Sequence, residues 1–164
     1  MLKPEVLKKI KKTFYTFIVF LIIICVLLIG ATFSDINVYW YVQLNKPYHP
    51  PFWVYILGWC FLYVLIAISA IIILTKKQTR KTKCPLALPL YLINAVLVSL
   101  YSILFFGLRA INLAFIETIF TLASIMLMIW CNSKISKLAA YLLVPYLIWI
   151  SYTIFLNAMI LFSN

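Results

Sequence analysis

The chain has 164 residues, of which 66% are hydrophobic and 10% are charged, and its mean hydropathy is +1.11. Soluble domains contain roughly 45–50% apolar residues, so this composition indicates a membrane protein. Fourteen Lys and Arg against three acidic residues give a formal charge of +11, which alone would suit a nucleic-acid-binding protein. The basic residues lie almost entirely in short gaps between apolar runs, however, and this excludes nucleic acid as a partner.

Five apolar runs are long enough to cross the membrane as helices, since about 20 residues span the roughly 30 Å hydrocarbon core. None alternates with the period of two that a barrel strand shows. We therefore predict an all-α fold, an integral membrane bundle of five transmembrane helices that forms a single domain over residues 1–164. The predicted spans cover about residues 14–33, 52–74, 86–106, 111–131 and 138–161.

The first run follows five lysines, a beginning that is also found in secretory signal peptides. The run from Phe14 is about 20 residues long, whereas a signal-peptide core has about 7–15, and no clear A-x-A cleavage site follows it. We expect it to remain as the first helix. Lysines at such a boundary are attracted to anionic headgroups, so membrane lipids are the expected partners.

The loop at residues 34–51 is rich in proline and aromatic residues. Pro47, Pro50 and Pro51 fix their φ angles and donate no hydrogen bond, so this loop holds its aromatic side chains at set positions. We predict that residues 34–51 form a lid over a binding pocket. His49 has no neighbouring His or acid for a metal site, and we interpret it as a loop histidine. An axial haem ligand needs only one side chain, so His49 stays a candidate if an iron porphyrin binds.

The second and fifth runs carry aromatic and polar residues at helical spacing. Tyr55, Trp59 and Tyr63 recur at i, i+4 and i+8, and Trp149 and Thr153 are also four residues apart. An aromatic belt at the membrane interface is the alternative for residues near the ends of the runs, but Trp59 and Trp149 lie deeper. Aromatic walls favour a flat, largely apolar ligand.

The third and fourth runs carry the polar residues that lipid tolerates least. Asn94 would be costly to expose to lipid, and Glu117 is the one acid inside a span. We interpret Glu117 as a protonated or hydrogen-bonded acid held by polar neighbours on other helices. The sequence contains no nucleophile elbow, P-loop or HExxH motif, and therefore predicts no catalytic or metal site. The four cysteines, Cys25, Cys60, Cys84 and Cys131, show no C-x-x-C or metal-site spacing.

The basic residues also predict an orientation. Five precede the first run, five lie between the second and third, and two lie between the fourth and fifth, whereas only Lys46 and Arg109 lie at the other end. The positive-inside rule places the N-terminus in the cytoplasm, with the lid and the C-terminus outside. We expect a bacterial inner membrane, with the mitochondrial outer membrane as the alternative.

The order and spacing of several motifs resemble those of the TspO/MBR family, the tryptophan-rich sensory proteins and translocator proteins, which are also described as peripheral benzodiazepine receptor-like. The similarity covers about residues 38–157. Its main motifs are Trp40-Tyr41-x-x-Leu44-x-Lys46-Pro47, Pro50-Pro51-x-Trp53, Trp59-x-x-Leu62-Tyr63, Phe105-Phe106-Gly107-x-Arg109 and Pro145-Tyr146-Leu147-x-Trp149.

The resemblance implies a membrane receptor or transporter, often dimeric, that binds porphyrins such as protoporphyrin IX and haem as ligands and requires no cofactor. One alternative is a light-dependent porphyrin-degrading activity, for which Trp59 and Trp149 would be the photochemically active pair. Another is a regulatory membrane partner protein without a small ligand. Carried over position by position, the implied ligand-binding residues are Tyr41, Pro50, Trp59, Asn94, Ser102, Trp149 and Thr153.

The sequence departs from the family pattern at several positions. The lid is one residue shorter than the usual K-P-S-W-x-P-P and lacks its tryptophan, with Tyr48 nearby. Val98 and Ser99 stand where the family commonly has Asn and Gln or Trp, which removes polar contacts to a ligand. The fifth run does not end in a Tyr followed by a basic residue, so cholesterol binding is not expected.

Overall fold

The computed structural model describes residues 13–14, 17–18, 21–22, 25–26, 28–29, 32, 38–46, 50–76 and 84–164. The described residues between 13 and 32 are helical. The rest of the first predicted span, which ends at residue 33, lies outside the described residues, and so do residues 34–37 and 47–49 of the lid, including His49. The remaining elements are α2 (Val38–Gln43), α3 (Phe52–Thr75), α4 (Ala87–Ser102), the π-helix η1 (Ile103–Gly107), α5 (Ile111–Ile135), α6 (Lys137–Tyr141) and α7 (Val144–Ser163).

No strand occurs in the described part of the chain, and the all-α membrane bundle predicted from the sequence is confirmed. Four segments are long and apolar enough to cross a membrane, and they coincide within a few residues with the last four predicted spans. These segments are Trp53–Thr75, Ala87–Gly107, Ile111–Ile135 and Lys137–Ser163.

Prolines lie where α3, α4 and α7 begin. Pro51 directly precedes α3, Pro89 lies in the first turn of α4, and Pro145 lies in the first turn of α7. The first turn of a helix needs no intrahelical N–H donors, so proline fits there without breaking a hydrogen bond. The same residue type therefore sets the helix starts at both ends of the bundle.

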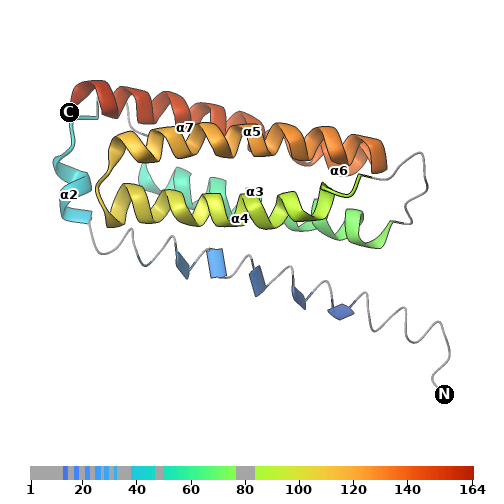
Figure 1. Ribbon diagram of the computed structural model, residues 1–164. Coiled ribbons are helices and arrows are strands. Elements are labelled where there is room, and N and C mark those ends of the chain that lie inside the picture. The colour runs from blue at the N-terminus through green and yellow to red at the C-terminus, as the bar shows by residue number, and fades with distance from the viewer. Residues whose placement is uncertain are drawn as a thin grey trace, which may run out of the picture.

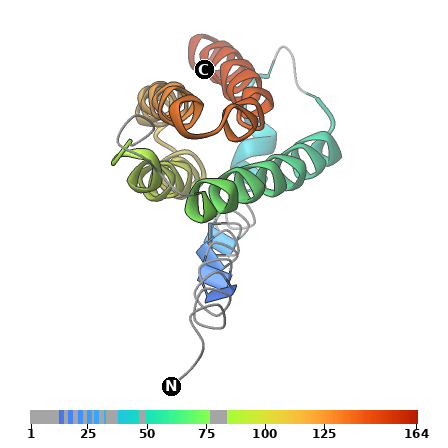
Figure 2. The ribbon, with the colours of Figure 1, turned by 90° about the vertical axis from the view of Figure 1, so that its right-hand side faces the viewer.

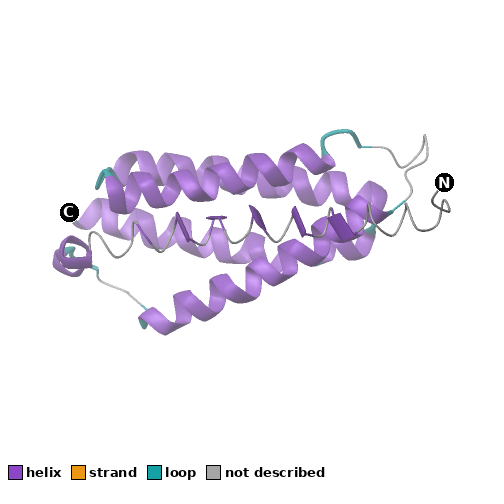
Figure 3. Ribbon diagram, turned by 90° about the horizontal axis from the view of Figure 1, so that it is seen from below, coloured by secondary structure: helices purple, strands orange, loops and turns teal. Residues whose placement is uncertain are grey.

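Helix α5 is the centre of the packing, since its closest contacts are with α4 on one side and α7 on the other (Figures 1 and 2). Ala114 and Ala139 are fully buried, and such small side chains let neighbouring helices approach closely in a membrane. Helix α3 is inclined to the other long helices (Figure 3). Many large apolar side chains face outward, as helices surrounded by lipid require.

The two ends of the bundle differ in composition (Figure 1). One end, here called the lid end, holds α2, Lys46, Arg109 and the end of α7. The opposite end, here called the lysine end, holds α6 and the lysines Lys76, Lys134 and Lys137.

Candidate ligand-binding site

A cavity of about 150 Å³ lies beneath α2 at the lid end, between α3, α4, η1 and α7. Six of its ten lining residues are aromatic, which gives the cavity flat apolar walls suited to stacking on a planar ligand. Its lining residues are Tyr41, Tyr55, Trp59, Tyr101, Phe105, Phe106, Thr153, Leu156, Asn157 and Ile160.

The π-helix η1 shapes the lid side of this cavity. The backbone N–H of Leu108 donates to the carbonyl of Ile103 at 2.8 Å, a bond that spans five residues and widens the turn. The widened turn brings two successive residues, Phe105 and Phe106, to the cavity wall. A regular α-helix would separate them by about 100°, so η1 is a local feature that builds the site.

Aromatic contacts hold α2 over the cavity. The ring centroids of Trp40 and Tyr41 lie 5.6 and 6.0 Å from that of Phe105, and Tyr41 lies 5.6 Å from Phe106. The Nζ atom of Lys46 lies 3.9 Å from the centroid of the Tyr41 ring. Tyr41 therefore contacts both the bundle and a cation.

Burial raises the pKa of Tyr41 to about 12 and lowers that of Lys46, because both lose water that would stabilise their charged forms. The Tyr41 hydroxyl is consequently neutral over the physiological pH range. It therefore adds no charge to the cavity.

A reciprocal pair of hydrogen bonds fastens the lid to α7. The backbone N–H of Asn45 donates to Oδ1 of Asn164 at 2.9 Å, and Nδ2 of Asn164 donates to the Asn45 carbonyl at 3.1 Å. Nδ2 of Asn164 also lies 2.8 Å from the carbonyl of Ile160, a residue that lines the cavity. The position of the lid thus depends on contacts with both η1 and α7.

A chain of hydrogen bonds runs from the cavity into the bundle. The Tyr101 hydroxyl donates to Oδ1 of Asn157 at 3.0 Å, and Nδ2 of Asn157 donates to Oγ1 of Thr118 at 3.1 Å. Thr118 in turn donates to the carbonyl of Ala114 at 2.7 Å. The polar groups of Tyr101 and Asn157 are therefore satisfied within the protein, which keeps this wall rigid.

A smaller void of about 20 Å³ adjoins the cavity, and Trp59, Tyr101 and Thr153 line both. Glu117 also lines this void, and Thr121 donates a hydrogen bond to its Oε1 at 2.6 Å. This donor lies one turn further along α5, whereas we expected polar neighbours on other helices. The void has room for about one water molecule, so Glu117 gives the inner end of the site a polar group.

Trp149 packs behind this wall and does not line the cavity. Its ring centroid lies 6.2 Å from that of Trp59 and 6.0 Å from that of Tyr55. Gly58 on α3 faces the indole so closely that an added Cβ would lie 2.4 Å from its Cη2 atom. The indole Nε1 is buried and has no hydrogen-bond partner in the described part of the chain.

The other predicted site residues are distributed around the bundle. Asn94 lines a separate, larger cavity of about 370 Å³ between α3, α4 and helical residues of the first span. Its amide is already engaged, since Nδ2 donates to Ser124 at 2.8 Å and Oδ1 accepts from Tyr146 at 3.0 Å. Pro50 and Ser102 are half-buried and line neither cavity.

The cavity under α2 thus brings together three of the predicted residues, Tyr41, Trp59 and Thr153. Sequence reasoning did not select Phe105 and Asn157, which also line it. Asn157, a polar residue within a transmembrane run, carried a usable signal. Phe105 belongs to one of the motifs that carry the family resemblance, but hydropathy does not reveal the π turn that brings it to the cavity.

The volume of the cavity sets a condition on ligand binding. Sites for small molecules usually measure about 300–1,000 Å³, and about 150 Å³ is too small for a large planar ligand. Such a ligand would need α2 to move outward or the walls to separate.

Comparisons with known proteins place this architecture among characterised relatives. The model of the TspO/MBR family matches residues 17–162. The chain is 29% identical over 137 residues to the tryptophan-rich protein TspO of Chlorobaculum tepidum, covering 82% of this chain and 86% of that protein. It is 30% identical over 111 residues to the tryptophan-rich sensory protein of Cereibacter sphaeroides, covering 67% of each.

The similarity extends to animals, since the chain is 32% identical over 121 residues to the translocator protein of Ovis aries, covering 72% of this chain and 70% of that protein. The matched region includes the lid, the four long helices and the aromatic cavity between them. This chain therefore belongs to the TspO/MBR family.

Proposed function

We propose that this protein is a membrane receptor or transporter that binds porphyrins, such as protoporphyrin IX and haem, and similar planar hydrophobic ligands beneath α2. Membership of the TspO/MBR family supports the receptor- or transporter-like role in a membrane. The observation that carries the ligand class is the aromatic cavity, in which Tyr41, Trp59 and Phe105 offer ring faces and edges from three different elements. Ligand entry requires displacement of α2.

The proposal includes an orientation and an assembly. The lysine end faces the cytoplasm of a bacterial cell, because cationic residues are retained on that side, and the lid faces outward. A porphyrin would therefore enter from the outer side. Two chains form a homodimer, as the family resemblance implies.

Binding can be tested by titrating the purified protein in detergent with protoporphyrin IX in the dark and measuring quenching of Trp fluorescence. Trp59→Phe removes the indole that lines the cavity. We expect the dissociation constant for protoporphyrin IX, obtained from the quenching curve, to rise by about threefold or more. Trp130→Phe is the matched control, because Trp130 is exposed at the lysine end beneath Lys134. Equal affinities of these two variants would reject the cavity as the porphyrin site.

A light-dependent degradation of porphyrin is the second candidate function. It is favoured by the contact between Trp59, which lines the cavity, and Trp149 behind it, whose ring centroids are 6.2 Å apart. In this role an excited porphyrin takes one electron from Trp59, which leaves a porphyrin radical anion and an indole radical cation whose charge Trp149 can share. Illumination of the complex should then bleach the porphyrin absorption band, and a rate that persists in Trp59→Phe/Trp149→Phe would exclude this role.

A further inference from the structure

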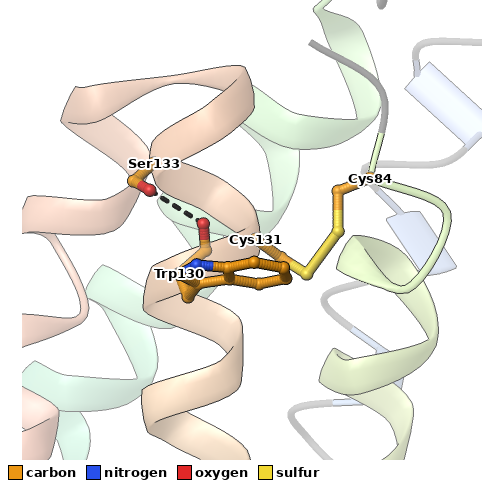
Figure 4. The surroundings of a disulfide bond; sticks show 4 residues. All are labelled: Cys84, Trp130, Cys131 and Ser133. Carbon is orange, nitrogen blue, oxygen red and sulfur yellow. Dashed lines mark hydrogen bonds between the residues drawn. A yellow bond between two sulfur atoms is a disulfide. The ribbon is translucent and has the colours of Figure 1, made fainter. Parts of the chain in front are cut away.

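Two cysteines that are 47 residues apart in sequence are joined by a disulfide at the lysine end (Figure 4). Cys84 lies three residues before α4, and Cys131 lies in the last turns of α5. Their Cα atoms are 5.7 Å apart, within the range that a disulfide requires. Cys25 and Cys60 are exposed and free, so the pairing is specific to two of the four cysteines.

The location of this bond conflicts with a permanent disulfide. Lys76 follows α3, Lys134 lies in the last turn of α5 and Lys137 begins α6, so these lysines lie at the same end of the bundle as the disulfide. This end faces the cytoplasm in the proposed orientation. Cytoplasmic glutathione and thioredoxin keep thiols reduced, and disulfides that form there are usually transient. The two cysteines are therefore placed to form a bond that the compartment would normally keep open.

We propose that Cys84 and Cys131 form a reversible thiol–disulfide site that ties the start of α4 to the end of α5 when a low-molecular-weight disulfide, such as glutathione disulfide, accumulates. The site is separate from the aromatic cavity at the lid end. The redox proposal can therefore be tested separately from the porphyrin proposal.

The two cysteines differ in access. Cys84 is 7% exposed and Cys131 is 1% exposed, so Cys84 is the side chain that an oxidant reaches first. Cys131 then serves as the resolving thiol because it is within bonding distance and shielded from solvent.

The reaction balances by two thiol–disulfide exchanges. The Cys84 thiolate attacks one sulfur of glutathione disulfide, which forms a mixed disulfide and releases one glutathione thiolate. The Cys131 thiolate attacks the Cys84 sulfur, which forms the protein disulfide and releases the second glutathione. The protein loses two electrons and two protons in total, and glutathione disulfide is reduced to two thiols. A dithiol such as reduced thioredoxin reverses both steps.

The disulfide lies next to a point where α3, α4 and α5 are joined by hydrogen bonds. Asn132, next to Cys131, donates to the Tyr91 hydroxyl of α4 at 2.7 Å, and that hydroxyl lies 2.6 Å from Oγ of Ser69 on α3. Leu88 and Pro89, which follow Cys84 in the first turn of α4, line the larger cavity. The disulfide therefore fixes the part of α4 that forms one wall of this cavity.

The redox state can be read from thiol labelling. The Cys25→Ser/Cys60→Ser variant retains only Cys84 and Cys131. Cells expressing it are treated with acid to stop thiol–disulfide exchange and then with N-ethylmaleimide to block free thiols. The protein is then reduced and treated with a maleimide that adds mass to each newly released thiol. We expect no added label in resting cells, two labels after inside-out membrane vesicles are exposed to glutathione disulfide, and none after dithiothreitol follows.

The structural effect can be read from heat denaturation of the same variant in detergent. We expect the oxidised form to have a midpoint about 5 °C or more above that of the reduced form, because the bond closes a long loop. This difference should be absent when Cys84→Ser is added. Two labels in resting cells, no label after glutathione disulfide, or equal midpoints of the oxidised and reduced forms would each overturn the proposal.

Discussion

Gly58→Ala tests whether α3 and α7 are as closely packed as the structure shows. A Cβ at position 58 would lie 2.4 Å from Cη2, 2.8 Å from Cζ3 and 3.0 Å from Cζ2 of Trp149, whereas ordinary contacts begin at 3.4 Å. The indole would have to retreat by about 1 Å. It has little room, because Tyr55, Trp59 and Tyr152 lie within 6.2 Å of it, measured between ring centroids.

Two opposing terms determine the size of the effect. Overpacking of a filled site costs about 1–3 kcal/mol, and the upper half of this range applies to a rigid ring that meets backbone-anchored atoms. Replacing glycine by alanine within a helix raises the free energy of unfolding by about 1 kcal/mol. We therefore expect a net loss of about 1–2 kcal/mol, which for a chain of this size lowers the midpoint of heat denaturation by about 2–8 °C.

A double-mutant cycle with Trp149→Phe supplies the control. Phenylalanine lacks the outer indole atoms that the new Cβ would meet, so Gly58→Ala should be tolerated or stabilising in that background. The expected coupling energy between positions 58 and 149 is about 1–3 kcal/mol in heat or denaturant unfolding in detergent. A stabilising Gly58→Ala in the parent protein, or additive effects in the cycle, would refute the packing described here.

Three further substitutions probe the polar contacts. Asn94→Ala leaves the Tyr146 hydroxyl without its acceptor, and we expect the unfolding free energy to fall by about 1–3 kcal/mol. An unchanged unfolding free energy would show that water replaces the amide and would contradict this expectation. Glu117→Gln keeps a hydrogen-bond acceptor and removes the charge, so its unfolding free energy should stay within about 1 kcal/mol of the parent; a larger loss would show that the ionised carboxylate is required. Asn164→Ala removes both hydrogen bonds to Asn45, and stopped-flow fluorescence should show faster entry and release of protoporphyrin IX, whereas unchanged rates would separate this contact from lid movement.

The sequence was sufficient for the bundle because a membrane imposes a length and a polarity on each helix. The last four predicted spans agree with the described helices within a few residues. Hydropathy is a local property, and the length and position of a span depend on little else. The predicted ligand-binding set is different, because Tyr41, Trp59 and Thr153 line one cavity whereas Pro50, Asn94, Ser102 and Trp149 do not, and ligand binding at these residues stays a prediction.

The features that the sequence did not predict depend on contacts between distant residues. Cys84 and Cys131 meet only because α4 and α5 run side by side in opposite directions (Figure 1). The sequence did not distinguish Gly58 from any other glycine within a helix, because its close contact is with Trp149 on α7. The cavity that holds Asn94 is separate from the one under α2, and helical spacing alone could not distinguish the two.

The polar face of α5 has a consequence for how the protein assembles after its helices enter the membrane. Thr118 meets a partner on α7 and Ser124 meets one on α4, so a rotation of α5 about its axis would turn both toward lipid. Each polar contact of this kind contributes roughly 0.6–2 kcal/mol in a bilayer. Hydrophobicity keeps α5 within the bilayer, whereas these contacts favour one rotation of the helix about its axis. Correct assembly therefore depends on a few hydroxyl and amide groups.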